Sequence, residues 1–412
     1  MDNRFDILVI GAGIVGLSTA YQINQQRPDL RIGVIEKENG PSRHQSGHNS
    51  GVIHSGIYYV PGSEKAVNCR RGYDMLLAFC REHGIDHEIC GKVIVATKES
   101  ERPFLDSVLQ RGLENGLKGV RKISAAETKA IEPHVNVVEA VWVPQAGIVN
   151  YKQVAEKYLE LFEGNGGEAF FNTRVTALKN QKDLQVVSTT KGAFKAELIV
   201  SCAGLYSDKI AAMSGIDTGL KIIPFRGEYY DLISEKQHLV NNLIYPVPNP
   251  AFPFLGVHYT RMIEGSIEAG PSAVLAFKRE GYSRWDINFK ELWEVLSFSG
   301  FHKIVRDNWK FGLGEIYRSF SKRAFVRALQ HLIPEVGFHD LERGNTGVRA
   351  MACDKAGNLI DDFRIFERPG ALHLCNAPSP AATASLSIGK TMAEKALAQM
   401  KSVSTHIKTI QK

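Results

Sequence analysis

Residues 6–16 read DILVIGAGIVG, and this stretch decides the fold class. Residues 6–10 form a short, β-branched apolar run of the kind found in buried strands. The run leads directly into a turn with glycines at positions 11, 13 and 16, and an apolar, alanine-rich segment that predicts a helix follows. The order of strand, glycine turn and helix is typical of a dinucleotide-binding βαβ unit.

The three glycines have different physical roles. Gly11 permits the tight turn from strand to helix, Gly13 lets the backbone approach a pyrophosphate, and Gly16 allows the helix to pack closely on the strand. The free amide groups at the start of the helix, with the positive end of its dipole, face the anion. The segment therefore predicts a binding site for a pyrophosphate.

A second predicted strand, IGVIE, ends on Glu36, twenty residues after Gly16. An acidic residue at this distance holds the ribose hydroxyl pair of a dinucleotide. A 2′-phosphate would meet a like charge there, so Glu36 favours an unphosphorylated ribose. Glu36 alone does not separate FAD from NAD, but the sequence has no second glycine triplet for an additional nicotinamide nucleotide site.

The composition limits the class of protein. With 412 residues and 44% hydrophobic content, the chain can bury a large core and is expected to form two domains. Its six cysteines are far apart and form no C-x-x-C pair, which argues against a metal site, a redox dithiol or a disulfide framework and predicts a reducing compartment. We expect neither a secretory signal nor a membrane-spanning segment. The net charge of +6 makes nucleic acid an unlikely partner and leaves open weak attraction to an anionic membrane or substrate.

A polar, glycine-rich stretch at residues 40–63 follows the nucleotide-binding unit. It contains His44, His48 and His54 among serines, asparagine and glycines, and it is a poor helix and a poor strand. A long loop in this position usually has a function. The alternative is a polar surface loop with solvated histidines.

The opening unit and this loop together resemble the glutathione-reductase-type FAD proteins of the D-amino-acid oxidase group. The string HQSGHNSGVIHSGIYY at residues 44–59 and the string NAPSPAATASLSIG at residues 376–389 are similar to those of L-2-hydroxyglutarate dehydrogenases, also called oxidases. The resemblance covers essentially the whole chain. It implies FAD as the cofactor and a dicarboxylate as the small-molecule substrate.

The resemblance also implies roles for individual residues. The loop at residues 40–63 would follow the pyrophosphate and the ribityl chain of FAD. Residue 175 would offer its backbone to the adenine part. Two strand-to-helix transitions would bring further backbone close to the cofactor. The implied cofactor-binding set is Gly11, Gly13, Gly16, Glu36, Ser46, His48, Asn49, Ser50, Gly51, Val175, Ala203, Gly204, Ser379, Ala381 and Ala382. A histidine in this loop bonds covalently to the flavin in related sarcosine-type dehydrogenases, but different neighbours around His48 disfavour that bond here.

Oxidation of a 2-hydroxy acid requires a hydride acceptor, a base for the hydroxyl proton and a cation for each carboxylate. His54 is our first candidate for the base, because a neutral imidazole is available near pH 7, and His258 is the second. For the carboxylates we predict Arg226 and Arg349, helped by Tyr259. The alternatives are an FAD-dependent amine oxidase of the glycine or sarcosine type, a nicotinamide dehydrogenase, and a non-catalytic nucleotide-binding regulator.

The predicted fold is α/β, with a discontinuous Rossmann-like FAD-binding domain and a second α+β domain that contains a mixed antiparallel sheet and helices. We assign residues 1–84, 145–217 and 340–400 to the first domain, residues 85–144 and 218–339 to the substrate domain, and residues 401–412 to a C-terminal tail.

Residues 286–335 predict three helices rich in tryptophan, phenylalanine, lysine and arginine. Such helices form either a domain lid with a solvated basic face or an amphipathic element at a membrane surface. The second interpretation fits a quinone as electron acceptor, with oxygen as the alternative. It predicts peripheral attachment to the cytoplasmic side of the inner membrane. The alternative is a soluble cytoplasmic location.

Overall fold

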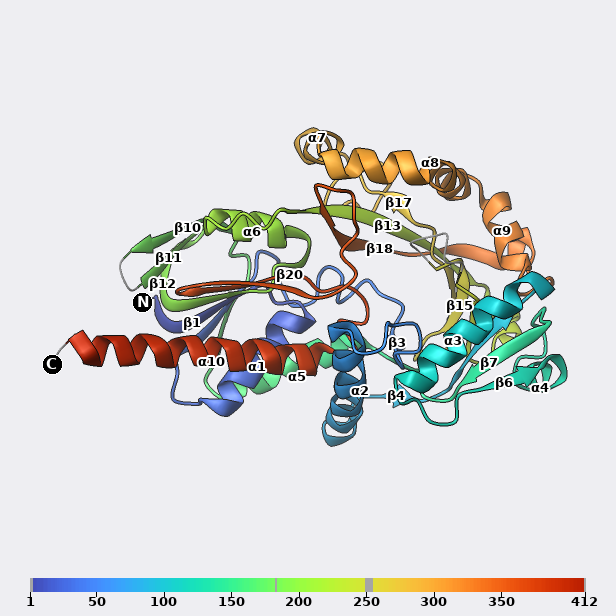
Figure 1. Ribbon diagram of the computed structural model, residues 1–412, viewed down its shortest axis with the longest axis horizontal. Helices are drawn as coiled ribbons and strands as arrows, with labels where there is room; N and C mark the ends of the chain where they lie inside the picture. The colour runs from blue at the N-terminus through green and yellow to red at the C-terminus, as the bar shows by residue number, and fades with distance from the viewer. Residues whose placement is uncertain (1–2, 182–183, 249–254, 411–412) are drawn as a thin grey trace.

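The computed structural model describes residues 3–181, 184–248 and 255–410, and two large sheets organise them (Figure 1). The first has eight strands, which are β10 (Val175–Gln181), β11 (Leu184–Thr189), β12 (Gly192–Ser201), β1 (Arg4–Ile10), β2 (Ile32–Ile35) and β9 (Glu168–Phe170) in spatial order, with β20 (Ala371–Asn376) beside β12 and β19 (Arg364–Arg368) beside β20. Its central strands β20, β12, β1, β2 and β9 are parallel, as a dinucleotide-binding fold requires.

The second sheet has nine strands. In spatial order they are β17 (Val274–Leu275), β13 (Leu220–Leu232), β16 (Ile267–Gly270), β15 (His258–Arg261), β14 (Leu243–Pro246), β5 (Lys92–Ala96), β7 (Glu139–Val143) and β6 (Arg121–Ser124), and β18 (Leu341–Asp354) pairs with β13. All its pairs are antiparallel except β14 with β5. The sheet curves from β13 and β18 near the top of Figure 1, through β15, to β7 and β6 at the lower right. A small third sheet of β3 (Val52–Ile53), β8 (Gly147–Val149) and β4 (His87–Glu88) lies between the two.

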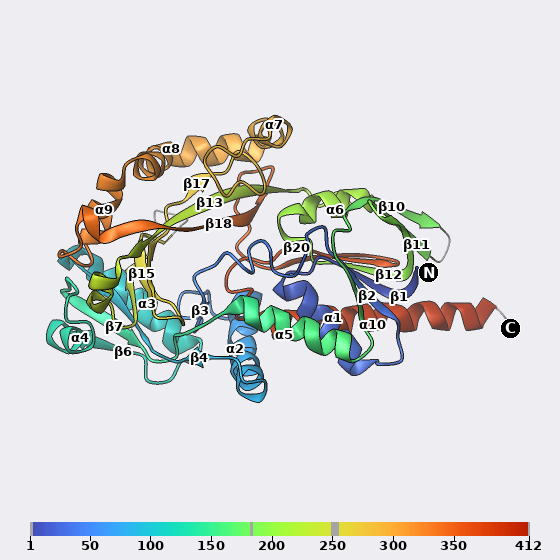
Figure 2. The same ribbon diagram turned by 180° about the vertical axis from the view of Figure 1, so that it is seen from behind.

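Helices cover both sheets. The first sheet carries α1 (Ile14–Gln26), α5 (Tyr151–Gly164) and α10 (Ser385–Ile410) on one face, side by side in Figure 2, and α6 (Ser207–Met213) on the other. The helix α2 (Glu64–Glu82) packs against α10. The second sheet carries α3 (Arg102–Glu114), α4 (Ala125–Ile131), α7 (Phe289–Leu296), α8 (Ser299–Phe320) and α9 (Lys322–Gln330).

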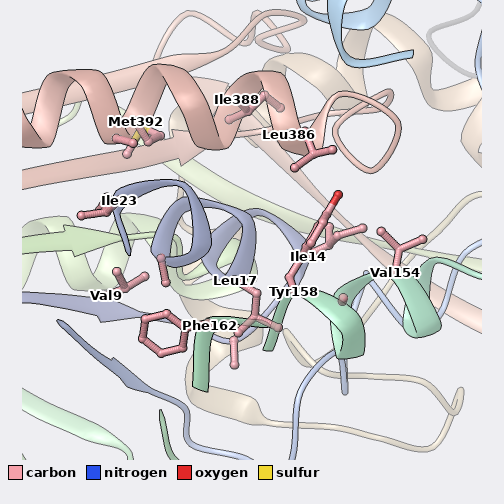
Figure 3. Close-up of a cluster of buried hydrophobic side chains, with 14 of the residues drawn as sticks. Val9, Ile14, Leu17, Ile23, Val154, Tyr158, Phe162, Leu386, Ile388 and Met392 are labelled. Atoms are coloured by element: carbon pink, nitrogen blue, oxygen red, sulfur yellow. The ribbon is translucent and has the colours of Figure 1, made fainter. Parts of the chain in front are cut away.

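The main core lies where α1 is enclosed by α5 and α10. Figure 3 shows Leu17 of α1 beside Phe162 of α5, while Ile388 and Met392 of α10 lie on the other side of α1. The contact with α10 is close, because a Cβ added at Gly389 would lie 2.2 Å from Ser18 Oγ. The Ser18 hydroxyl also donates a hydrogen bond of 2.8 Å to the Ser385 carbonyl. The start of α10 is thereby fixed on α1.

The predicted fold class is confirmed, and so are the three helices predicted in residues 286–335. Two boundaries lie elsewhere. β18 pairs with β13 over its whole length, so residues 341–354 belong to the second sheet. By this criterion the domain boundary expected at residue 340 lies at about residue 354. The backbone of the expected tail at residues 401–410 continues α10.

Candidate functional site

The glycine turn at the end of β1 has the geometry that a bound anion requires. Gly11 has φ +108°, and a Cβ there would lie 2.6 Å from the Cys202 carbonyl oxygen. A Cβ at Gly16 would lie 1.9 Å from the Gly11 oxygen. No larger residue fits either position, so α1 starts directly against the end of the strand. The N-terminus of the helix carries no acidic side chain in its first turn.

Two side chains border this turn. Ser46 Oγ accepts a hydrogen bond of 2.9 Å from the Ile14 amide and would lie 3.3 Å from a Cβ at Gly13. The Glu36 carboxylate accepts from the amides of Ala12 and Glu38, each at 2.9 Å. Ser46 and Glu36, predicted from positions far apart in the sequence, thus converge on the same turn.

The backbone segments at residues 170–175 and 202–204 lie beside them. The Thr173 amide donates to the Glu36 carbonyl at 2.8 Å, and Val175 starts β10 just beyond. The Cys202 amide donates to the Ile10 carbonyl at 2.9 Å, which brings Ala203 and Gly204 to the edge of the glycine turn. Gly204 has φ +50°, a conformation that favours glycine. These segments meet at the carboxyl ends of the parallel strands.

The histidine-containing loop joins the two sheets. Gly347 in β18 must be glycine, because a Cβ would lie 2.5 Å from the His48 carbonyl oxygen. His48 Nδ1 donates to the Thr346 carbonyl at 3.0 Å. Asn49 stabilises the loop itself: its amide donates to Ser46 O at 2.8 Å, and its Oδ1 accepts from the Gly51 amide at 2.9 Å. The side chain of Asn49 therefore shapes the loop at residues 40–63, while that of the half-buried Ser50 makes no such contact.

His44, the first histidine of the loop, belongs to a separate polar cluster. Its ring bonds the Tyr282 hydroxyl at 2.8 Å and lies 3.1 Å from the carboxylates of Glu38 and Glu280. The Lys37 ammonium forms ion pairs with both carboxylates, so this cluster is an internal salt-bridge network.

His54 is held between the loop and the C-terminal segment. Its amide donates to Thr383 Oγ1 at 3.1 Å, and its carbonyl accepts from the Cys69 thiol at 3.3 Å. Thr383 is itself fixed by the Tyr151 hydroxyl at 2.6 Å. The ring nitrogen Nε2 lies 3.3 Å from Ser379 Oγ. The two strings that carried the family resemblance therefore meet at this imidazole.

One face of the nine-stranded sheet carries groups whose charges act on His54. His258 of β15 stacks on Tyr245 of β14 with ring centroids 4.0 Å apart, and its Nδ1–H donates to the Gly256 carbonyl at 2.9 Å. That hydrogen bond leaves the lone pair on Nε2 of His258. Burial raises the pKa of the Tyr229 hydroxyl overall, although Arg349 of β18 lies close enough for its charge to lower that pKa.

Lys92, the first residue of β5, opens an otherwise apolar strand and is 1% exposed. Its Nζ lies 4.6 Å from the ring centroid of Tyr58 and 4.7 Å from that of Tyr245. Burial lowers the pKa of Lys92 to about 7.

The charges of these groups act on the same two histidines. Burial lowers the pKa of His54 to about 3, and the charge of Lys92, followed by His258, Lys65 and Arg349, lowers it further in the same direction. Burial also lowers the pKa of His258 to about 3, helped by Arg349 and Lys92. Both imidazoles are therefore neutral near pH 7 and available to accept a proton.

The charges of the site are not balanced. Lys65 forms an ion pair with Asp361 at 2.5 Å. Lys92 and Arg349 form no ion pair with any carboxylate within residues 3–181, 184–248 and 255–410. A buried positive charge without a partner is costly, so the site is suited to an anion.

Two predicted substrate residues lie elsewhere. Across the β13–β18 pair, Arg349 is opposite Phe225 and Arg226 is opposite Val348. Side chains of paired residues share a face of the sheet and those of successive residues alternate, so the two arginine side chains point to opposite faces. Arg226 is 3% exposed and is paired with Glu228 at 3.0 Å. The prediction that it binds substrate does not fit this placement, because its charge is already compensated.

Tyr259 is also directed away from the site. It points to the opposite face of β15 from His258, as the strand alternation predicts, and donates to the Leu329 carbonyl of α9 at 3.3 Å. The residues that sequence reasoning missed are Tyr58, Lys92, Tyr229 and Tyr245. A lysine at the start of an apolar strand was the one available signal.

Comparisons with known proteins agree with this geometry. A family model described as "FAD dependent oxidoreductase" matches residues 6–395. The chain belongs to the FAD-dependent oxidoreductase family. The oxidoreductase is 54% identical over 394 residues to the L-2-hydroxyglutarate dehydrogenase of Indibacter alkaliphilus, covering 95% of this chain and 99% of that protein. It is 43% identical to the L-2-hydroxyglutarate dehydrogenase of Escherichia coli K12, covering 95% and 93%. The resemblance predicted from the sequence is confirmed.

A solved structure shares the fold of the oxidoreductase. The dithionite-reduced L-alpha-glycerophosphate oxidase of Mycoplasma pneumoniae, with FAD bound, superposes with a TM-score of 0.78 at 23% identity, covering 96% of this chain and 95% of that one. The oxidoreductase is an enzyme whose cofactor is FAD. The residues present fit this group: the glycine turn cannot hold larger side chains, and the helix amides and the Glu36 carboxylate lie where a pyrophosphate and a ribose require them.

Proposed function

We propose that this enzyme oxidises L-2-hydroxyglutarate to 2-oxoglutarate. The observation that carries the proposal is the convergence of two neutral imidazoles and unpaired positive charge at the junction of the cofactor loop with the nine-stranded sheet. A hydroxy acid needs a base for its hydroxyl proton and a cation for its carboxylate. The names of the full-length relatives support the choice of substrate.

The chain's own residues supply the remaining steps. FAD, when bound, accepts the hydride from C2 of the substrate. We assign the base to His54, because both its amide and its ring contact the segment at residues 379–383 that would border the flavin. With Nε2–H donated to Ser379, the lone pair on Nδ1 takes the hydroxyl proton. Arg349, which lies beside Tyr229, binds the carboxylate next to the reacting carbon.

The cofactor site in this proposal keeps the residues expected from the sequence. The glycine turn, Ser46 and the α1 N-terminus hold the pyrophosphate, and Glu36 holds the ribose. Val175, Ala203 and Gly204 approach with their backbones, and the segment containing Ser379, Ala381 and Ala382 faces the flavin ring. His48 is not a covalent ligand in this proposal, and its Nδ1 donates to the Thr346 carbonyl.

The test is reduction of the enzyme-bound flavin without oxygen. We expect L-2-hydroxyglutarate to bleach the flavin absorption, whereas D-2-hydroxyglutarate and sarcosine leave it unchanged. The alternative function, oxidation of glycine or sarcosine, needs no histidine base because a neutral amine can transfer hydride unaided. Bleaching by sarcosine but not by L-2-hydroxyglutarate would establish that alternative instead.

For the second half-reaction we propose a membrane quinone as electron acceptor, with the enzyme attached peripherally to the cytoplasmic face of the inner membrane. The support is a row of exposed apolar side chains on α7, α8 and the loop before them: Trp285, Phe289, Trp293, Trp309, Leu313, Tyr317 and Phe320 are each 52–80% exposed. Within the described part of the chain, no helix combines the length and the apolar character needed to cross a bilayer. Reoxidation of the reduced enzyme by a soluble quinone analogue, compared with oxygen, identifies the acceptor.

A further inference from the structure

The buried lysine of β5 has no explanation in the steps above. Lys92 is 1% exposed, and among the described residues it has no carboxylate partner. Two aromatic rings, those of Tyr58 and Tyr245, lie beside its ammonium group at 4.6 and 4.7 Å. Cation–π contacts compensate only part of the free energy of burying an ammonium ion. The buried charge of Lys92 therefore requires a further partner, which can be a bound ligand.

A second buried donor lies at the same place. The hydroxyl group of Tyr58 is buried and has no hydrogen-bond partner in the described structure. Buried polar groups are almost always satisfied, and an exception beside a buried, unpaired charge is consistent with a ligand atom that binds both. Lys92 can only donate hydrogen bonds, and Tyr58 can donate one. Two donors from different segments, one in β5 and one in the loop at residues 40–63, therefore lie close together, and neither has an acceptor among the described residues.

The position of Lys92 relative to the reaction centre is also informative. Of the charged groups around His54, Lys92 exerts the largest effect on the imidazole, and Arg349 acts on the same imidazole. Lys92 and Arg349 come from distant strands of the curved sheet, β5 and β18. Both also act on His258. Two unpaired cations thus approach one pair of histidines from two different strands.

We propose that Lys92, assisted by the Tyr58 hydroxyl, binds the distal carboxylate of the substrate and makes the site selective for dicarboxylates. The inference rests on the proposed function, in which Arg349 binds the carboxylate beside the reacting carbon. Two carboxylates then match two unpaired cations, and a monocarboxylate would leave Lys92 buried without a counter-charge. Selectivity follows because only a dicarboxylate gains the ion pair with Lys92, whereas a monocarboxylate binds without it.

The test compares L-2-hydroxyglutarate with L-2-hydroxypentanoate, which has the same carbon chain but lacks the distal carboxylate. For Lys92→Met, which removes the charge at similar length, we expect kcat/KM for L-2-hydroxyglutarate to fall about 10²-fold, mainly through KM, and that for L-2-hydroxypentanoate to change little. Lys92→Arg should recover part of the loss. Unchanged discrimination between the two acids in Lys92→Met would overturn the proposal.

Lys65→Met is the matched control. Lys65 is also buried near His54, but Asp361 already compensates its charge. We expect this variant to keep the wild-type ratio of kcat/KM for the two acids. A loss of discrimination equal to that of Lys92→Met would show that general positive charge, and not Lys92, determines the selectivity.

Binding of glutarate separates this proposal from the proposed function. Glutarate has both carboxylates but no hydroxyl group to oxidise, and pentanoate lacks one carboxylate. We expect glutarate to perturb the flavin spectrum of the wild-type holoenzyme, and Lys92→Met to weaken this binding on the order of 10²-fold without affecting pentanoate. If L-2-hydroxyglutarate fails to bleach the flavin but glutarate binds in this pattern, the proposed reaction is wrong and the role of Lys92 stands. If glutarate binds equally to both proteins, the role of Lys92 is wrong whatever the reaction.

The pH dependence provides a second readout. Burial holds the pKa of Lys92 at about 7, and only its protonated form attracts a carboxylate. We therefore expect kcat/KM for L-2-hydroxyglutarate to decline as pH rises above about 7, and this decline to be absent in Lys92→Arg, because arginine stays protonated. An identical alkaline decline in Lys92→Arg would contradict the assignment.

Discussion

His54 lies among positive charges, and two of these, Lys92 and Arg349, have no carboxylate partner among the described residues. The order of effects on its pKa is burial first, then Lys92, His258, Lys65 and Arg349, and all of them favour the neutral ring. If His54 is the base, His54→Ala should slow anaerobic bleaching by L-2-hydroxyglutarate at least ~10²-fold. Rapid-mixing absorbance measures this rate. His258→Ala is the matched control, and a larger loss in that variant would assign the proton transfer to His258.

The same residue predicts a difference between two pH profiles. A bound dicarboxylate places negative charge beside the imidazole and so raises the pKa of His54 above the value of about 3 in the free enzyme. The neutral base is then lost at higher pH in the complex than in the free enzyme. Protonation of His54 lowers both the bleaching rate at saturating substrate and kcat/KM as the pH falls. We expect the bleaching rate at saturating substrate to fall at the higher pH of the two. A saturated rate that is flat down to pH ~4, near the pKa of the substrate's own carboxyl groups, would contradict this.

Single residues also show what the sequence could and could not predict. Gly11, Gly16 and Glu36 were predictable, because their roles follow from local backbone geometry at fixed spacing. Arg226 and Arg349 could not be told apart, since each lies in a strand and only the pairing of β13 with β18 decides which face each occupies. The partner of Arg226, Glu228, is two residues away, and that i,i+2 spacing on a strand was an available warning.

Helices α7 and α8 form a layer that leaves many apolar side chains in contact with solvent. They lie along the edge of the molecule opposite α10 (Figure 1). Trp285 and Phe289 are 79% and 80% exposed, and Trp293 is 69% exposed. The sequence predicted these helices from their composition, but only the structure shows that their aromatic side chains are not covered by the domain beneath. Exposed aromatic groups of this kind are typical of a docking surface.

We expect replacement of Trp285, Phe289 and Trp293 by serine to weaken binding to anionic phosphatidylglycerol vesicles at least ~10²-fold, because three aromatic side chains no longer enter the interface. Flotation measures the bound fraction, and anaerobic bleaching by L-2-hydroxyglutarate should not change. Leu113→Ser is the control, since Leu113 is a 50% exposed apolar residue on the distant helix α3. If the wild-type enzyme stays unbound and sedimentation shows a dimer that the triple variant loses, the surface contacts a second copy of the chain.

At the level of the whole molecule, the site exists only because segments distant in sequence are held together. In the proposed site, the cofactor turn comes from β1 and α1, the proposed base from the loop at residues 40–63, and the proposed opposite wall from the segment before α10. Local patterns predicted each segment and its element type. Their convergence depends on the contacts of α1 with α10 and of Thr383 with Tyr151 and His54, which no local pattern contains.

Those contacts make the packing of α10 a determinant of the active site. A methyl group at Gly389 would lie 2.2 Å from Ser18 Oγ, and the neighbouring backbone leaves little room for adjustment. We expect Gly389→Ala to lower the free energy of unfolding by about 1–3 kcal/mol and to weaken FAD binding with it, because the segment at residues 379–384 shifts with α10. Thermal unfolding and release of flavin fluorescence measure the two effects. Gly164→Ala, at the exposed end of α5 where a Cβ meets nothing within 4 Å, should leave both unchanged or slightly improved. A loss of stability in Gly389→Ala with unchanged flavin affinity would show that α10 supports the fold without positioning the cofactor wall.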